Sequence, residues 1–115
     1  VAGVSLGRAL ANLPEDPALH QTLRDVLVLF RRHKGEWLSD SDVRIKTGSP
    51  APHVTVILPV LARAFVLDFD GATGKYRFGG DAVLGYEIDS FTRRVDSQQA
   101  HMRTNVAKFR ERYGS

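Results

Sequence analysis

The 115-residue chain contains no cysteine and only four histidines, and both scarcities narrow the chemistry open to it. Without cysteine there is no disulfide framework and no thiolate metal site. Each histidine falls in a different predicted segment, and none stands at a metal-ligand spacing from a second histidine or a carboxylate. We therefore expect neither a metal nor a cofactor at His20, His33, His53 or His101.

Long apolar runs and catalytic motifs are also missing. No segment approaches the ~20 continuous apolar residues of a membrane-spanning helix, and the first residues lack the charged and apolar regions of a signal peptide. Gly74-Lys75 fails as a phosphate loop, because that motif needs glycine in place of Phe69 and a hydroxyl residue in place of Tyr76. No nucleophile stands beside a base. The expectation is a cytoplasmic protein that has no membrane partner and is not an enzyme.

The composition that remains is that of one globular domain with a slight basic excess. Hydrophobic residues make up 43% and charged residues 25%, which suits a single domain with a modest core. Lysine and arginine number 16 against 13 acidic residues, which gives a formal charge of +3 and a pI of about 9.6. This excess permits a polyanionic partner without requiring one.

Two helices are predicted before residue 36. An arm over residues 1–14 carries an apolar stripe at helical spacing after the candidate cap Ser5, formed by Leu6, Ala9, Leu10 and Leu13. Asp16-Pro17 is a strong start for the second helix, whose apolar residues repeat with a period of 3.6 up to Gly35. The end of this helix carries four basic residues, Arg31, Arg32, His33 and Lys34. Their charges suit the negative pole of the helix dipole, which explains them structurally. A functional role is the alternative.

The segment from Glu36 to Ala64 is predicted to hold a strand fragment and two helices joined by a tight turn. Trp37 belongs to the strand fragment and should pack under the hairpin that follows. Residues 39–42 supply oxygens for the free amides of a helix start, and Gly48 is placed to end that helix in a left-handed conformation. Ser49 offers a polar cap to the next helix, which Pro59 should kink or shorten.

A hairpin is predicted from Phe65 to Phe78, because the apolar period there changes from helical to two. The first strand should expose Val66 and Asp68 and bury Phe65, Leu67 and Phe69. Residues 70–74 carry turn chemistry, which explains Asp68 and Asp70 without a metal. The second strand alternates again, with Tyr76 and Phe78 pointing inward and Lys75 and Arg77 pointing outward.

Residues 81–115 are predicted to form one long helix with a heptad seam, whose positions are spaced alternately by four and three. A stutter after residue 102 loosens the supercoil without ending the helix. A helix of about thirty residues is roughly 45 Å long, more than a small domain covers. We therefore expect a homodimer joined through Leu84, Ile88, Phe91, Val95, Gln98, Met102, Val106 and Phe109. The alternative is that the first turns, from Leu84 to Phe91, complete the core of their own chain.

This order of elements over Asp16 to Tyr113 resembles the winged helix-turn-helix superfamily of DNA-binding proteins, in particular dimeric bacterial regulators with a terminal dimerisation helix. The resemblance implies an α+β, mostly α fold with three parts: an N-terminal arm (1–14), a winged domain (15–80) and a dimerisation helix (81–115). It also implies duplex DNA as the partner and transcriptional regulation by a homodimer as the function. The residues that would contact DNA are Arg44, Lys46, Thr47, Ser49, His53, Thr55, Arg63, Lys75 and Arg77.

The outward face of the predicted recognition helix, residues 50–64, departs from the superfamily pattern. A helical projection places His53 at the edge of this face, which is formed by Pro52, Thr55, Val56, Pro59 and Arg63. Bases are read by forked polar groups, and this face offers one arginine and one threonine among apolar groups. Binding through phosphates and DNA shape is therefore favoured over dense base readout. The alternative function is a winged-helix subunit of a chromosome-organising or replication complex, with a protein partner on this apolar face.

Overall fold

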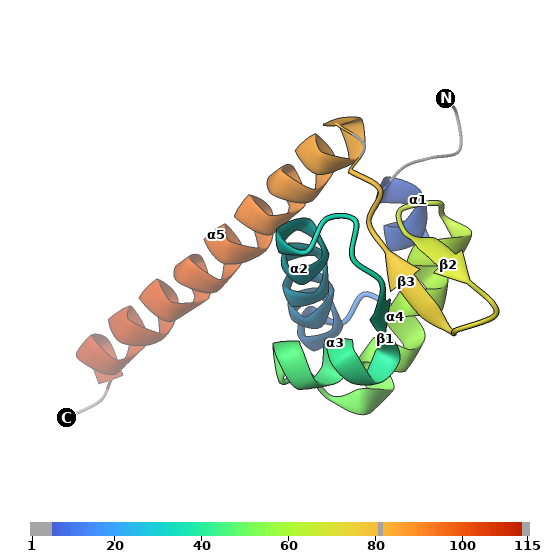
Figure 1. Ribbon diagram of the computed structural model, residues 1–115. Helices are drawn as coiled ribbons and strands as arrows, with labels where there is room; N and C mark the ends of the chain where they lie inside the picture. The colour runs from blue at the N-terminus through green and yellow to red at the C-terminus, as the bar shows by residue number, and fades with distance from the viewer. Residues whose placement is uncertain (1–5, 81, 114–115) are drawn as a thin grey trace.

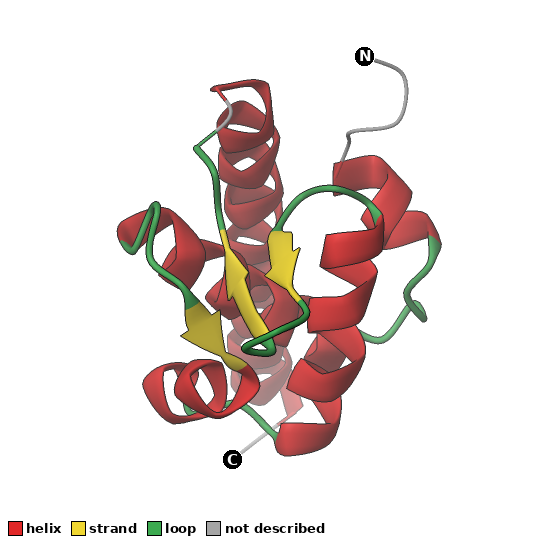
Figure 2. Cartoon of the chain, turned by 45° about the vertical axis from the view of Figure 1, so that its right-hand side comes forward, coloured by secondary structure: helices red, strands yellow, loops and turns green. Residues whose placement is uncertain are grey.

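The computed structural model describes the backbone of residues 6–80 and 82–113 and the side chains of residues 6–80 and 82–98. This part of the chain folds into helices around a small antiparallel sheet, so the expected α+β, mostly helical class is confirmed (Figures 1 and 2). Two predicted boundaries, the cap at Ser5 and the helix start at Asp81, lie outside the described residues.

The helices are α1 (Leu6–Ala11), α2 (Pro17–Arg32), α3 (Asp40–Thr47), α4 (Ala51–Arg63) and α5 (Ala82–Tyr113). The strands are β1 (Leu38–Ser39), β2 (Asp68–Asp70) and β3 (Lys75–Arg77). Within the described ranges, no helix combines the length and the apolar character needed to cross a membrane.

Side-chain chemistry at the helix ends explains most of these bounds. Asp16 caps α2 by accepting the Ala18 N–H at 2.9 Å, and α3 begins with a reciprocal capping box between Ser39 and Asp42. Gly48 ends α3 with φ 65°, as predicted. Two expectations are wrong: α2 ends at Arg32 rather than Gly35, and α4 starts after Pro50 without any side-chain cap, so the expected cap from Ser49 is not formed.

The sheet has the strand order β1-β3-β2, so the hairpin formed by β2 and β3 gains β1 as a third strand. Leu38, Tyr76 and Phe69 stand opposite one another in register and therefore share one face. Leu38, Tyr76 and Phe78, which follows β3, are buried, which confirms the inward pointing of the two aromatic residues predicted for the second strand. The other face carries Arg77 opposite Asp68.

The predicted burial of residues 65–69 is right for Leu67 and Asp68 and wrong for Phe65, Val66 and Phe69. Val66 and Leu67 are both buried, whereas Phe65 and Phe69 are 64% and 53% exposed. The cause is the end of α4, where the Val66 N–H bonds to the Leu61 carbonyl at 2.9 Å and the Phe65 N–H bonds to the Ala62 carbonyl at 3.1 Å. This pair of bonds is a Schellman motif, and it places Phe65 in the left-handed conformation at φ 62° with its ring outward. The strand therefore starts only at Asp68.

The core lies between α2, α4 and the first turns of α5, with α1 packed against α4 and α5. Leu23, Phe30, Ile57 and Leu61 are fully buried at its centre. The Leu6 N–H donates to Glu87 Oε2 at 2.6 Å, which joins the start of α1 to α5. The arm predicted over residues 1–14 is thus part of the core from Leu6 onward.

The first half of the predicted dimer seam also belongs to this core. Leu84, Ile88, Phe91 and Val95 are at most 6% exposed, because they pack against α2 and its neighbours in the same chain. The expectation that these four residues join a second chain is therefore corrected. Gln98 is exposed, and the side chains of Met102, Val106 and Phe109 lie outside the described residues.

Ion pairs at the rim strengthen the contact between α2 and α5. Arg24 binds both carboxylate oxygens of Asp96, at 3.1 and 3.2 Å, and Arg31 binds Asp89 and the Gly85 carbonyl. The carboxylate of Asp96 raises the pKa of Arg24. Arg31 thus has a structural role in joining α2 to α5, whereas the predicted interaction of these cations with the helix dipole stays a prediction.

Candidate nucleic-acid interface

The exposed face of α4 matches the helical projection made from the sequence. Pro52, Thr55, Val56 and Arg63 are exposed, and Pro59 is half-buried. Pro59 does not shorten the helix, which continues to Arg63, and the Arg63 Nε donates to the Pro59 carbonyl at 3.4 Å. This face therefore presents one cation and one hydroxyl among apolar groups, which is a weak set for reading base edges.

His53 connects α4 to α2 instead of facing outward with these residues. Its Nδ1 lies 3.0 Å from the hydroxyl of Thr22, a residue of α2 that is only 4% exposed. The same hydroxyl lies 3.2 Å from the Ala18 carbonyl, so it has polar partners on both helices. The His53 ring therefore helps to orient α4 relative to α2, and its Nδ1 is already engaged by Thr22.

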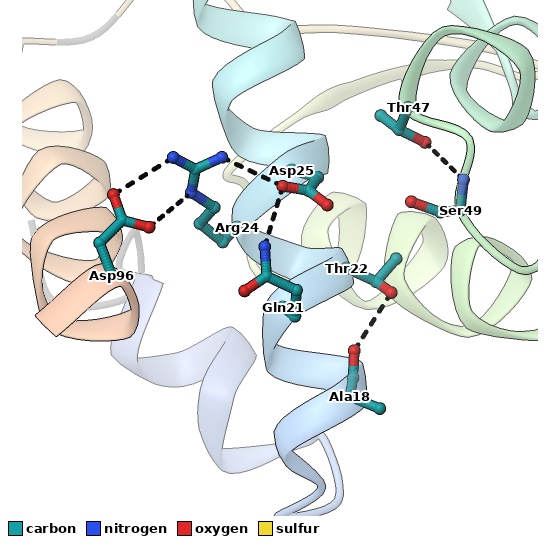
Figure 3. A network of polar contacts seen from close by, with 8 residues as sticks. All are labelled: Ala18, Gln21, Thr22, Arg24, Asp25, Thr47, Ser49 and Asp96. Carbon is teal, nitrogen blue, oxygen red and sulfur yellow. Dashed lines mark hydrogen bonds and ion pairs between the residues drawn. The ribbon is translucent and has the colours of Figure 1, made fainter. Parts of the chain in front are cut away.

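The turn between α3 and α4 uses two more of the predicted contact residues. The Thr47 hydroxyl donates to the Val43 carbonyl at 2.7 Å and accepts the Ser49 N–H at 3.3 Å. Figure 3 shows this turn beside the polar network of Gln21, Arg24, Asp25 and Asp96 that runs from α2 to α5. Thr47 and Ser49 thus fix the geometry of the turn between the two helices.

The cations of α3 differ in how far they are already engaged. Arg44 Nε lies 2.6 Å from Asp40, and its guanidinium also reaches the Ser41 hydroxyl at 3.2 Å. Lys46 is exposed and borders an open groove of about 510 Å³ between α2 and α3, which also contains Arg32 and His33. The sequence analysis did not identify this groove. Arg32 and Lys46 lie at the ends of α2 and α3, where the negative poles of two helix dipoles favour them, and Arg24 lines the groove from the middle of α2 beside Asp25.

Lys75 and Arg77 on β3 are both partly exposed, and Arg77 has a close anionic partner. The Arg77 guanidinium donates to Asp68 Oδ2 from Nη2 at 3.1 Å and from Nε at 3.4 Å. On its other side it lies 4.4 Å above the centre of the Trp37 ring. Trp37 is 38% exposed, so the expectation that it packs beneath the hairpin is wrong: its ring lies on the outer face of the sheet.

The acids near Lys75 are directed elsewhere. Asp70 stands opposite Lys75 in the sheet, yet its carboxylate accepts from the Thr73 hydroxyl at 2.8 Å and the Ala72 N–H at 3.0 Å. These bonds lower the pKa of Asp70. Asp42 is engaged by Ser39, and that bond, with a smaller contribution from the charge of Lys75, lowers the pKa of Asp42. Within the part of the chain that has described side chains, no carboxylate forms an ion pair with Lys75.

The sequence analysis did not identify Trp37 and Asp68 as part of this surface. These contacts follow from the strand register, in which Asp68 stands opposite Arg77 and Trp37 precedes Leu38, the partner of Tyr76. The sequence alone does not reveal that β1 lies beside β3. The surface of α3, α4 and the outer sheet face offers cations and no built metal site: no group of three or more metal-binding side chains occurs among residues 6–80 and 82–98.

Comparison with known proteins assigns no family to this chain. No protein-family model matches the chain, and neither the curated proteins nor the solved structures include a match.

Proposed function

We propose that the chain is a DNA-binding protein of the winged helix-turn-helix kind, with α3 and α4 as the helix pair and the β2–β3 hairpin as the wing. The observation that carries the proposal is the arrangement of these elements. α3 and α4 are joined by a left-handed turn at Gly48 and both pack on α2, and they precede an antiparallel hairpin with Lys75 and Arg77 on its solvent face. Helix pairs and hairpins placed in this way bind the major groove and the adjacent backbone.

The proposed contacts are mainly to phosphates. Lys46, Arg63 and Lys75 have exposed or partly exposed side chains and would meet the backbone, with the Thr55 hydroxyl on the same face of α4 as Arg63. Arg44 would contribute less, because Asp40 already neutralises its charge. Thr47, Ser49 and His53 would act by holding α3, α4 and α2 in position. Affinity should therefore depend strongly on salt and weakly on sequence.

The proposal includes regulation by a homodimer, whose interface differs from the one predicted from the sequence. Because Leu84 to Val95 are buried by their own chain, two copies would meet through the later part of α5. Two observations support this interface. Met102, Val106 and Phe109 are spaced as on one face of a helix, and the later part of α5 leads away from the other elements (Figure 1). Such a protein would act on duplex DNA in the cytoplasm, associated with the nucleoid.

A second candidate function is favoured by exposed apolar side chains on the same helices. Ile45 on α3 is 80% exposed and Val56 on α4 is 46% exposed, and neither side chain suits a phosphate. A winged-helix subunit of a chromosome-organising or replication complex would use them to bind a protein.

The test is fluorescence polarisation with a mixed-sequence duplex at several salt concentrations. We expect the wild type to bind at low salt and to lose affinity steeply as salt rises, because phosphate contacts release counterions. Lys75→Ala with Arg77→Ala should weaken binding to all duplexes by similar factors and reduce the salt slope by about one to two.

The matched control removes two cations elsewhere, Arg93→Ala with Arg94→Ala on the exposed side of α5, and should change the slope less. A wing double variant that binds as tightly as the wild type with the same slope would show that the wing is assigned incorrectly. Absence of binding at low salt would favour the protein-binding candidate.

A further inference from the structure

Three side chains form a row across the outer face of the sheet, one from each strand or its immediate flank. Trp37 precedes β1, Arg77 lies in β3 at the centre, and Asp68 begins β2. The Arg77 guanidinium is in contact with both neighbours, 4.4 Å above the Trp37 ring centre and 3.1 Å from Asp68 Oδ2. All three side chains remain partly exposed to solvent, so the row is a surface feature and not part of the core.

The guanidinium in this row is held between an aromatic ring and a carboxylate. A flat aromatic ring below it limits its motion and leaves its N–H groups directed sideways, where the carboxylate of Asp68 lies. Carboxylate and phosphate oxygens accept the same charge-assisted hydrogen bonds from a guanidinium. Asp68 therefore occupies the place that a backbone phosphate would take on Arg77.

The neighbouring cation shows that this pairing is not a general property of the hairpin. Asp70 lies directly opposite Lys75, yet its carboxylate is turned into the loop by Thr73 and Ala72. Two acids on β2 thus face two cations on β3, and only Asp68 neutralises its partner.

We infer that Asp68 is a built-in competitor for phosphate on Arg77, which lowers the affinity of the wing for nucleic acid and limits non-specific binding. The inference rests on the proposed DNA-binding function and assigns its regulation to one carboxylate. A phosphate that binds Arg77 through Nε and Nη2 must displace Asp68, so part of the attraction between Arg77 and DNA is offset by the loss of an internal ion pair. Lys75 contacts phosphate without this cost.

The decisive variant is Asp68→Asn, which keeps the size of the side chain and removes its charge. We expect the affinity for mixed duplex DNA to rise about three- to fivefold, in line with the strength of exposed ion pairs. The salt dependence should become steeper by about one, because Arg77 then releases one more counterion. Circular dichroism and thermal melting would verify that the sheet is retained.

Two controls separate this effect from a general increase in positive charge. Glu15→Gln makes the same charge change at an exposed position beside the groove between α2 and α5, and it should alter affinity less than twofold. Arg77→Gln combined with Asp68→Asn should abolish the gain. Equal affinity of Asp68→Asn and wild type, or a gain that survives Arg77→Gln, would overturn the inference.

A second readout keeps the inference distinct from the proposed function. Trp37 is the only tryptophan of the chain, so its fluorescence reports on the row directly. Inorganic tripolyphosphate should change Trp37 emission with a midpoint at lower concentration in Asp68→Asn than in the wild type. If no variant binds DNA, the proposed function fails, and the two tripolyphosphate midpoints still decide: a lower one in Asp68→Asn supports the competitor, and equal ones refute it.

Discussion

Phe65 is the residue whose backbone is least suited to its side chain. Left-handed backbone conformations are disfavoured for residues with a Cβ, and the corresponding position after a helix is usually taken by glycine. At φ 62°, with its ring 64% exposed, Phe65 recovers little of this cost by burial. Its neighbours Ala64 and Val66 are both buried, and the Schellman bonds hold Val66 against the end of α4.

Phe65→Gly should therefore stabilise the protein, by up to about 1 kcal/mol, because it relieves the left-handed strain at small loss of buried area. Urea unfolding at equilibrium measures the change. Phe65→Ala is the matched control: it removes the ring and keeps a Cβ, so it should bring no gain. If glycine and alanine proved equally destabilising, the exposed ring would be contributing packing that outweighs the strain.

The attachment of α5 to α2 combines two kinds of contact of unequal strength. Ile88 is 1% exposed and fills the interior, whereas Asp89 next to it forms an ion pair with Arg31 at the rim, with both side chains partly in water. Burial of an isoleucine contributes several times more than an exposed ion pair, which is screened by salt and costs side-chain entropy.

Ile88→Ala should accordingly lower the free energy of unfolding by about 2 to 5 kcal/mol, and Asp89→Asn by less than about 1 kcal/mol. Chemical denaturation of both variants in the same buffer gives the comparison. A larger loss for Asp89→Asn than for Ile88→Ala would mean that the ion pairs, and not the apolar contacts, hold α5 in place.

The positions of most elements could be predicted from sequence, because they depend on local chemistry. Asp16, Ser39 and Gly48 mark helix ends through hydrogen bonds or backbone conformations that a few neighbouring residues determine. The alternation in β3 was also readable, since Tyr76 and Phe78 are the only large apolar residues in that segment.

Features that depend on distant parts of the chain could not be read in this way. Phe65, Val66 and Leu67 follow Ala64, and nothing in their order shows that Phe65 belongs to the end of α4. Because it does, the strand starts only at Asp68. The spacing of Leu84 to Val95 is the same whether a helix packs on its own chain or on a second copy. The pairing of Arg77 with Trp37 requires β1 to lie beside β3, residues nearly forty positions apart.

At the scale of the whole molecule, α5 determines the shape. The radius of gyration is 15.9 Å, compared with about 13 Å for a compact domain of this length, and the longest dimension is 58 Å. α5 comprises 32 residues, and among its described side chains, which end at Gln98, those of Leu84, Ile88, Phe91 and Val95 belong to the core. In the proposed dimer, the later turns of α5 would join the two copies.

Val95→Asp and Met102→Asp should therefore behave differently. Val95→Asp places a charge in the core and should lower stability by at least about 2 kcal/mol. Met102→Asp should keep the wild-type melting temperature and convert a dimer to a monomer in sedimentation velocity at tens of micromolar. A wild type that sediments as a monomer, or a Met102→Asp protein that stays dimeric, would remove the proposed interface from α5.

The position of β2 at the end of the sheet has a consequence for solubility. An edge strand offers unpaired backbone groups to other chains, and an aromatic residue on it adds to the risk of aggregation. β2 is three residues long, no strand pairs with its outer edge in the described part of the chain, and the exposed Phe69 lies between Asp68 and Asp70. Two such edges approaching each other would bring four carboxylates together. The acids on β2 thus act as gatekeepers that keep the sheet from recruiting further strands.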